Sequence, residues 1–147
     1  MNIKENVGMK GKLIIFKKDE NNNLIKVLEK DNLIVTSGFN YIADLMAALP
    51  VGNMTHIGVG SSSTAPSVGQ TTLVTQLFRK IFFNRDGDNN IFRIESQFNP
   101  GEGTGTWREA GIFNNAVGGT MLNRVTFADF SKLATETVII RFEVSFI

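Results

Sequence analysis

The carboxyl-terminal segment TVIIRFEVSFI, residues 137–147, constrains the fold more than any other part of the sequence. Its residues alternate with a period of two, and successive side chains of a β-strand point to opposite faces of a sheet. One face of the expected strand is entirely apolar and consists of Val138, Ile140, Phe142, Val144 and Phe146. The other face is mixed and consists of Ile139, Arg141, Glu143, Ser145 and Ile147. The segment therefore predicts a strand that covers a hydrophobic core.

Further short apolar runs, separated by turn residues, predict several more strands. They cover residues 12–16, 24–28, 32–35, 55–60, 79–84 and 90–98. The sequence DENNN at 19–23 predicts a turn between the first two runs. Asp-Gly between β-rich runs is a strong hairpin signal, so residues 85–88 are expected to form another hairpin tip.

One segment has the spacing of a short amphipathic helix. Thr36 and Ser37 are candidate N-caps, and Pro50 with Gly52 marks the end. The apolar stripe of this helix is expected to pack on the sheet as part of the core. It consists of Phe39, Ile42, Leu45, Met46 and Leu49.

The stretch GTWREAGIFNNAVGGTMLNRVTF, residues 105–127, predicts a hairpin around an Asn/Gly turn. Its expected core residues, besides Trp107, are Ile112, Phe113, Leu122, Val125 and Phe127. Arg108 and Glu109 are adjacent, so in a strand they point to opposite faces. A charge that faces inward needs a partner. We expect Glu109 to pair with a basic residue across the sheet or across a subunit boundary, with Arg124 as the first candidate.

These elements predict a mainly β protein: an antiparallel β-sandwich or flattened barrel with one short α-helix packed on it. The 147 residues fit a single β-rich domain, 1–147, and the 42% hydrophobic content can supply one core. The polar, Gly-containing residues 1–11 are expected to form a flexible or docking arm.

Composition excludes several classes of function. A net charge of +1 argues against a nucleic-acid binder, which needs clustered Lys and Arg. The chain has no Cys, which excludes disulfides and thiolate chemistry. No apolar run reaches the length of a membrane span, so membrane insertion is not expected. The amino-terminal residues lack the apolar stretch of a signal peptide, and we expect synthesis in a cytoplasm.

No motif predicts catalysis, a metal site or a cofactor. The Gly-rich segment 58–66 lacks the Lys of a phosphate-binding loop, and the single histidine, His56, has no nucleophile-elbow motif beside it. Asp86, Asp88 and Asn90 begin like a calcium loop, but the positions for its Gly and Glu hold Ile91 and Gln97. Glu102 and Glu109 could be chosen as the two carboxylates of a glycoside hydrolase. Any chain with 14 acidic residues allows such a choice, so the pair does not indicate this activity. We therefore expect no catalytic residue, no metal ligand and no cofactor.

Five segments in order resemble a group of small tail-associated structural proteins of bacteriophages and prophages. They are SGFNYIADLM, HIGVGSSSTAPSVGQTTL followed six residues later by Arg79, WREAGIFN, GGTMLNRVTF and TVIIRFEVSF. Together they run from Ser37 to Phe146, about three-quarters of the chain.

The resemblance implies a non-enzymatic virion component of the tail, tail fibre or neck, made in the host cytoplasm. Its partners would be copies of itself, in a trimer or ring, and other virion proteins. The candidate interface residues are Trp107, Arg108, Glu109, Arg124, Arg79, Ile139 and Ile147. The alternative is a β-sandwich module that binds host-surface glycans, for which Trp107 would have to be exposed.

Overall fold

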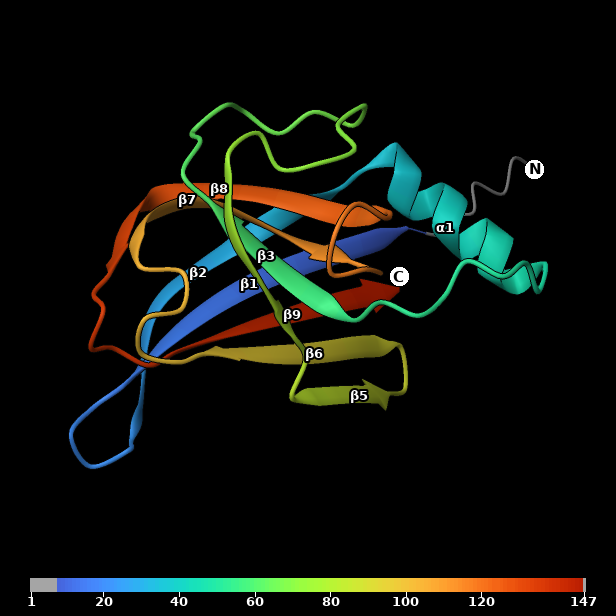
Figure 1. Cartoon of the computed structure of the whole chain (residues 1–147). Helices are drawn as coiled ribbons and strands as arrows, with labels where there is room; N and C mark the ends of the chain where they lie inside the picture. Colours follow the sequence, from blue (N-terminus) through green and yellow to red (C-terminus); the bar gives the residue numbers. More distant parts are fainter. Residues whose placement is uncertain (1–7, 147) are drawn as a thin grey trace, which may run out of the picture.

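The computed structural model describes residues 8–146 (Figure 1). These residues form nine strands and one helix. In chain order they are β1 (Met9–Lys18), β2 (Leu24–Ile34), α1 (Thr36–Met46), β3 (His56–Gly60), β4 (Gln76–Ile81), β5 (Asn84–Asp88), β6 (Ile91–Phe98), β7 (Gly105–Phe113), β8 (Met121–Lys132) and β9 (Val138–Phe146). Ile147 and residues 1–7 lie outside the described residues.

The strands form one antiparallel sheet in the order β4-β3-β7-β8-β2-β1-β9-β6-β5. The sheet curls into a half-barrel, which confirms the prediction of a mainly β, antiparallel fold with one short helix. Strands β2 and β8 pair at only two positions, Leu33 and Ile34. On the other side the two ends of the sheet approach each other, and the Ser96 hydroxyl of β6 donates to the Lys80 carbonyl of β4 at 3.0 Å.

The hydrophobic core fills the inside of the curl. Strand β9 contributes four of its alternate residues, Val138, Ile140, Phe142 and Val144, all buried as predicted. Ile112, Leu122, Val125 and Phe127 of the β7–β8 hairpin belong to the same core, as predicted. Phe113 is buried as predicted, but in a second, smaller cluster with Val35, Leu73 and Met121. The aromatic part of the core is centred on Trp107, whose ring centroid lies 5.0 Å from that of Phe98 and 5.3 Å from that of Phe130.

Two residues of the terminal strand differ from the prediction. Phe146, expected in the core, is 41% exposed: its backbone still pairs with Met9 of β1, but its side chain lines an open hollow at the end of the sheet. Ile139, expected on the mixed outer face as a candidate interface residue, is only 4% exposed within the single chain. It lies between Phe16 of β1 and Gln97 of β6 in the register, and these neighbouring side chains enclose it.

The amino-terminal arm was predicted to extend too far. Residues 9–11 belong to β1, where Met9, Lys10 and Gly11 pair with Phe146, Ser145 and Val144 of β9. Residue 8 precedes the strand. The rest of the predicted arm, residues 1–7, lies outside the described residues.

The predicted Asp-Gly hairpin tip is also shifted. Asp86 and Gly87 are paired within β5, opposite Arg93 and Phe92. The turn is instead made by Asn89 and Asn90, and Asn89 adopts the left-handed conformation with φ 54°. Asn tolerates this region better than most residues, which explains why the turn forms at the Asn pair and not at Asp-Gly. The Asn/Gly turn of the β7–β8 hairpin lies where it was predicted, with Gly118 and Gly119 at φ 65° and 72°.

Helix α1 lies across one end of the curled sheet (Figure 1). Its buried residues are Gly38 and Tyr41, and Ile42 is half-buried. Gly38 packs directly on the backbone of β8, so close that an added Cβ would overlap the Leu122 carbonyl. The Ser37 hydroxyl donates to the Met121 carbonyl at 2.8 Å and therefore fastens the helix to β8 instead of capping it.

The predicted core stripe of the helix is therefore wrong at four of its five positions. Phe39, Leu45, Met46 and Leu49 are exposed, and Met46 reaches 84%. The helix contacts the sheet through the narrow strip that Gly38 and Tyr41 define, because it sits at the end of the sheet and not on its face.

Candidate functional site

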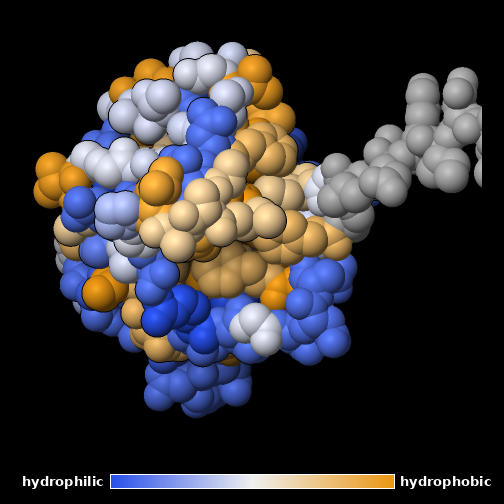
Figure 2. Space-filling model, turned by 90° about the vertical axis from the view of Figure 1, so that its right-hand side faces the viewer, coloured by the Kyte–Doolittle hydropathy of each residue, from blue (hydrophilic) through white to orange (hydrophobic). Residues whose placement is uncertain are grey.

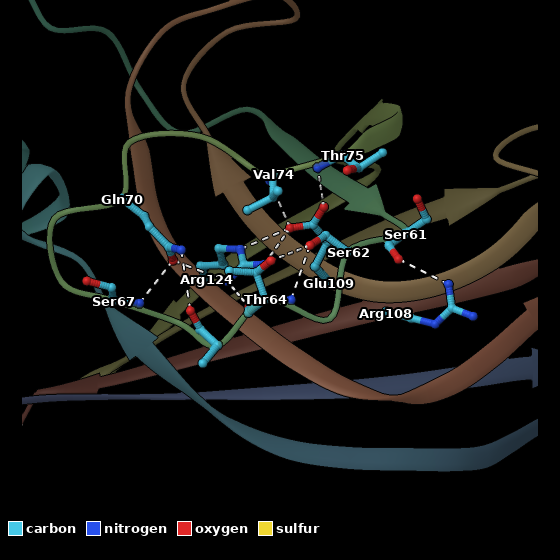
Figure 3. A network of polar contacts seen from close by, with 11 residues as sticks. Ser61, Ser62, Thr64, Ser67, Gln70, Val74, Thr75, Arg108, Glu109 and Arg124 are labelled. Atoms are coloured by element: carbon cyan, nitrogen blue, oxygen red, sulfur yellow. Dashed lines mark hydrogen bonds and ion pairs between the residues drawn. The ribbon is translucent and has the colours of Figure 1, made fainter.

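Two places in the described chain bring together unusual groups of side chains. The first is a buried ion pair beneath the loop of residues 61–75 (Figure 3). The second is an apolar hollow beside α1 (Figure 2).

The buried ion pair joins Glu109 of β7 to Arg124 of β8. Both side chains are 0% exposed, and the guanidinium donates to Glu109 Oε2 from Nη2 at 2.7 Å and from Nε at 3.0 Å. The expected pairing of Glu109 with Arg124 is confirmed, and it occurs within one chain across the sheet. The cost of burying such a charge pair is offset only when its remaining polar atoms also have hydrogen-bond partners.

The loop supplies those remaining partners. The backbone N–H groups of Val74 and Thr75 donate to the Glu109 carboxylate at 3.0 and 2.7 Å. Arg124 Nη1 donates to the Thr64 carbonyl at 2.7 Å and to Gln70 Oε1 at 3.2 Å. Figure 3 shows these contacts converging from both arms of the loop, which holds the loop against the sheet.

A glycine makes this close approach possible. Gly60, at the end of β3, lies against Glu109 and the Thr75 carbonyl, and an added Cβ would overlap both. The sequence thus places its smallest residue where the loop, the carboxylate and the strand meet.

The backbone N–H groups at the end of the loop of residues 61–75 are already occupied. The adjacent N–H groups of Val74 and Thr75 are the kind of donors that bind a phosphate or carboxylate. Here they already bind the chain's own carboxylate, Glu109.

The remaining polar candidates also have structural contacts. Arg108 points away from Glu109, as predicted, and pairs with exposed Asp129 at 2.7 Å while donating to the Ser61 carbonyl at 3.1 Å. The Arg79 guanidinium stacks 3.5 Å from the ring centroid of Phe113. It also donates to the carbonyls of Asn115 and Gly118 at 2.9 and 2.8 Å, which holds the β7–β8 turn.

His56 and the neighbouring serines do not form a nucleophile pair. The His56 ring bonds the Thr55 hydroxyl at 2.7 Å, and the Ser62 hydroxyl donates to Thr64 at 2.9 Å. Burial lowers the pKa of His56, and the nearby charge of Arg79 lowers it further.

Glu102 and Glu109 are not a carboxylate pair. Each is held by its own base: Glu102 accepts from Lys80 Nζ at 2.7 and 2.8 Å. Hydrogen bonds from Lys80 and from the Asn99 backbone lower the pKa of Glu102. In residues 8–146, no three His, Cys, Asp or Glu side chains lie close enough to hold a metal ion. Asp86 and Asp88 lie in a strand, so the calcium-loop geometry is not formed there.

Trp107 is fully buried and its indole N–H donates to the Gly103 carbonyl at 2.7 Å. It is a core residue, and its ring is not available as the exposed sugar-stacking platform that the glycan-binding alternative requires.

The hollow beside α1 has a volume of about 400 Å³, which is in the range of ligand and side-chain pockets. Figure 2 shows it as a depression surrounded by apolar residues. Its apolar lining comes from β1, α1, β6 and β9 among other elements, and includes Met9, Tyr41, Leu45, Phe92, Val144 and Phe146. Its polar lining residues are Asn53 and Arg85.

Sequence reasoning did not foresee this hollow. Leu45 and Phe146 were assigned to the core, and Met9 to the arm. No sequence signal places Arg85 in the same hollow as residues of α1, because β5 is far from the helix in the chain and only the curl of the sheet lets both line the hollow.

Comparison with known protein families, with curated proteins and with solved structures finds no match to this chain. None of the helical segments within residues 8–146 has the length and apolar character to cross a bilayer.

Proposed function

We propose that the chain is a non-enzymatic structural component of a bacteriophage virion, a tail, tail-fibre or neck-associated adaptor that self-assembles and docks to other virion proteins. The virion assignment depends on the resemblance of the five ordered segments between Ser37 and Phe146 to tail-associated proteins. The self-assembly depends on the surface of the molecule.

The observation that carries self-assembly is the exposed apolar surface around α1. It includes five large side chains: Phe39, Leu45, Met46, Leu49 and Phe146. Contiguous apolar surface of this kind on a folded domain marks an interaction site, since leaving it in water is unfavourable. The hollow beside it gives the surface a shape that a protruding side chain can fill.

The interior of the molecule is consistent with the same role. The loop of residues 61–75 is held by Glu109 and Arg124, and the turn of residues 114–120 is held by Arg79. The chain uses these charged groups to fix the shape of the domain, which suits a building block that must present constant surfaces.

Mass spectrometry of purified phage particles tests the virion assignment. The chain is expected in a fixed number of copies per particle, and antibody labelling in electron micrographs is expected at the tail or neck. Particles that lack the chain while the host cytoplasm contains it would refute the assignment.

Size-exclusion chromatography with light scattering tests self-assembly separately. A trimer or larger ring is the expected species, and a monomer at all accessible concentrations would contradict it.

A further inference from the structure

The end of the molecule opposite the hollow carries a second exposed apolar feature, the tip of the β1–β2 hairpin. We define the tip as residues 19–27. Leu24, Ile25 and Val27 are 45%, 50% and 44% exposed there. Strand β2 pairs with β8 only at Leu33 and Ile34, so the outer edge of β2 has no neighbouring strand along the tip. Figure 1 shows the tip projecting from the sheet at the end remote from α1.

The tip is a preorganised structure. The Asp19 carboxylate accepts hydrogen bonds from the backbone N–H groups of Asn21 and Asn23 at 2.9 and 2.8 Å. Asn22 occupies the left-handed conformation at φ 61° that the turn requires. A rigid projection loses little conformational entropy when it binds, which favours association.

The hollow carries a cation whose charge is not balanced within the described chain. Of the six arginines, five have hydrogen-bond or ion-pair partners, but no such contact is found for Arg85 within residues 8–146. The tip carries the complementary group, because the side chain of Glu20 is exposed and makes no hydrogen bond within the same residues, whereas Asp19 is engaged in the turn. The other charged side chain of the tip beyond the turn, Lys26, is paired with Glu29 at 3.2 Å.

We propose that the hollow beside α1 binds the β1–β2 tip of a second copy of this chain. Ile25 of one copy enters the apolar hollow of the next, and Glu20 lies opposite Arg85. The hollow is therefore an incomplete site that another copy completes. This inference rests on the proposed self-assembly and names the surfaces that carry it.

The two surfaces lie at opposite ends of the domain, so the contact is heterologous, that is, head to tail. In a pair formed in this way, one copy still has a free tip and the other still has a free hollow. Such a contact continues until the ring closes, or extends as an open chain if the rotation between copies does not close.

Two variants and a matched control test the contact. Ile25→Asp places a charge on the tip, and Leu45→Asp places one at the rim of the hollow; both positions are exposed, so the fold should persist. Val117→Asp is the control, because Val117 on the β7–β8 turn is 85% exposed and neither lines the hollow nor belongs to the tip. Circular dichroism checks folding, and Arg85→Glu serves as a second hollow variant that does not alter α1.

Light scattering should show self-association weakened about tenfold or more for Ile25→Asp, Leu45→Asp and Arg85→Glu, the range of a binding hot spot, with Val117→Asp unchanged. Mixing Ile25→Asp with Leu45→Asp should produce a one-to-one heterodimer and nothing larger, since the mixture retains one intact tip and one intact hollow per pair. Combining Glu20→Arg with Arg85→Glu in one chain should restore assembly.

The outcomes separate this contact from the proposed function. If the wild type assembles and all three variants assemble equally well, the tip–hollow contact is refuted and self-assembly stands. If only the hollow variants fail and the tip variant assembles normally, a different partner surface fills the hollow and the contact is again refuted. A monomeric wild type would refute both self-assembly and the contact, while the presence of the chain in particles would still be decided by mass spectrometry.

Discussion

At the scale of single residues, the buried Glu109–Arg124 pair has the greatest influence on the structure. The pair and the N–H groups of Val74 and Thr75 satisfy each other away from solvent. Removing one charge leaves the other buried and uncompensated, which is far more costly than losing a surface pair.

We predict that Glu109→Gln lowers the free energy of unfolding by about 3–5 kcal/mol, the range for breaking a buried ion pair. Urea denaturation at neutral pH measures it. Asp129→Asn is the control, since it removes the exposed partner of Arg108 and should change stability far less. Equal effects of the two substitutions would show that the buried pair has no special role.

A second prediction at this scale concerns acid stability. Hydrogen bonds from Lys80 and the Asn99 backbone lower the pKa of Glu102 in the folded state below its ordinary value of 4.5. The carboxylate therefore contributes stability above the unfolded-state pKa, and this contribution is lost as pH falls through the folded-state pKa.

The difference in unfolding free energy between wild type and Glu102→Gln should thus be largest near pH 7 and should shrink as pH falls below about 4.5. Urea titrations across this range measure the difference. A gap that stays constant, or that widens in acid, would contradict the assignment.

At the scale of elements, the position of α1 depends on one glycine. Gly38 meets the Leu122 carbonyl of β8, while Ser37 bonds the Met121 carbonyl. The helix is therefore fixed at its first turn, and Tyr41, Ile42 and Leu45 further along it form one wall of the hollow.

We predict that Gly38→Ala destabilises the domain by about 1–3 kcal/mol, the cost of overpacking, because the helix must move away from β8. Thermal denaturation gives the size of the effect. Gly69→Ala is the matched control, since an added Cβ there meets nothing within 4 Å. If both substitutions leave the melting temperature unchanged, the helix is not fixed through Gly38.

At the scale of the whole molecule, the curl of the sheet creates two different ends. One end holds α1, and the other holds the projecting β1–β2 tip (Figure 1). The hollow lies at the α1 end, since the helix lines it. A domain with distinct ends is suited to head-to-tail repetition, and self-assembly links stability to concentration.

We therefore predict that the melting temperature of the wild-type chain rises with protein concentration, because association stabilises only the folded state. Scanning fluorimetry over a hundredfold range of about 1 to 100 μM measures the trend. The Ile25→Asp variant should show a melting temperature that does not depend on concentration. A flat profile for the wild type would argue against association in this range.

Local patterns were sufficient for much of the fold. The alternation of residues 138–144 predicted which side chains of β9 are buried, and the Asn/Gly turn predicted the β7–β8 hairpin. The need of Glu109 for a basic partner even indicated Arg124, because two adjacent charges on one strand cannot both face water on the same side. These features depend on backbone geometry and on the cost of burying charge, which neighbouring residues largely set.

Only the tertiary structure decided what the apolar residues of α1 and the end of β9 do. Leu45 and Phe146 have core-like spacing, yet they line an open hollow because α1 lies across the end of the sheet. The partners that make this hollow, Met9 and Arg85 among them, come from distant parts of the chain. The period of the apolar residues indicates on which side of its own helix or strand a side chain lies. The packing of all the elements determines whether another element covers that side.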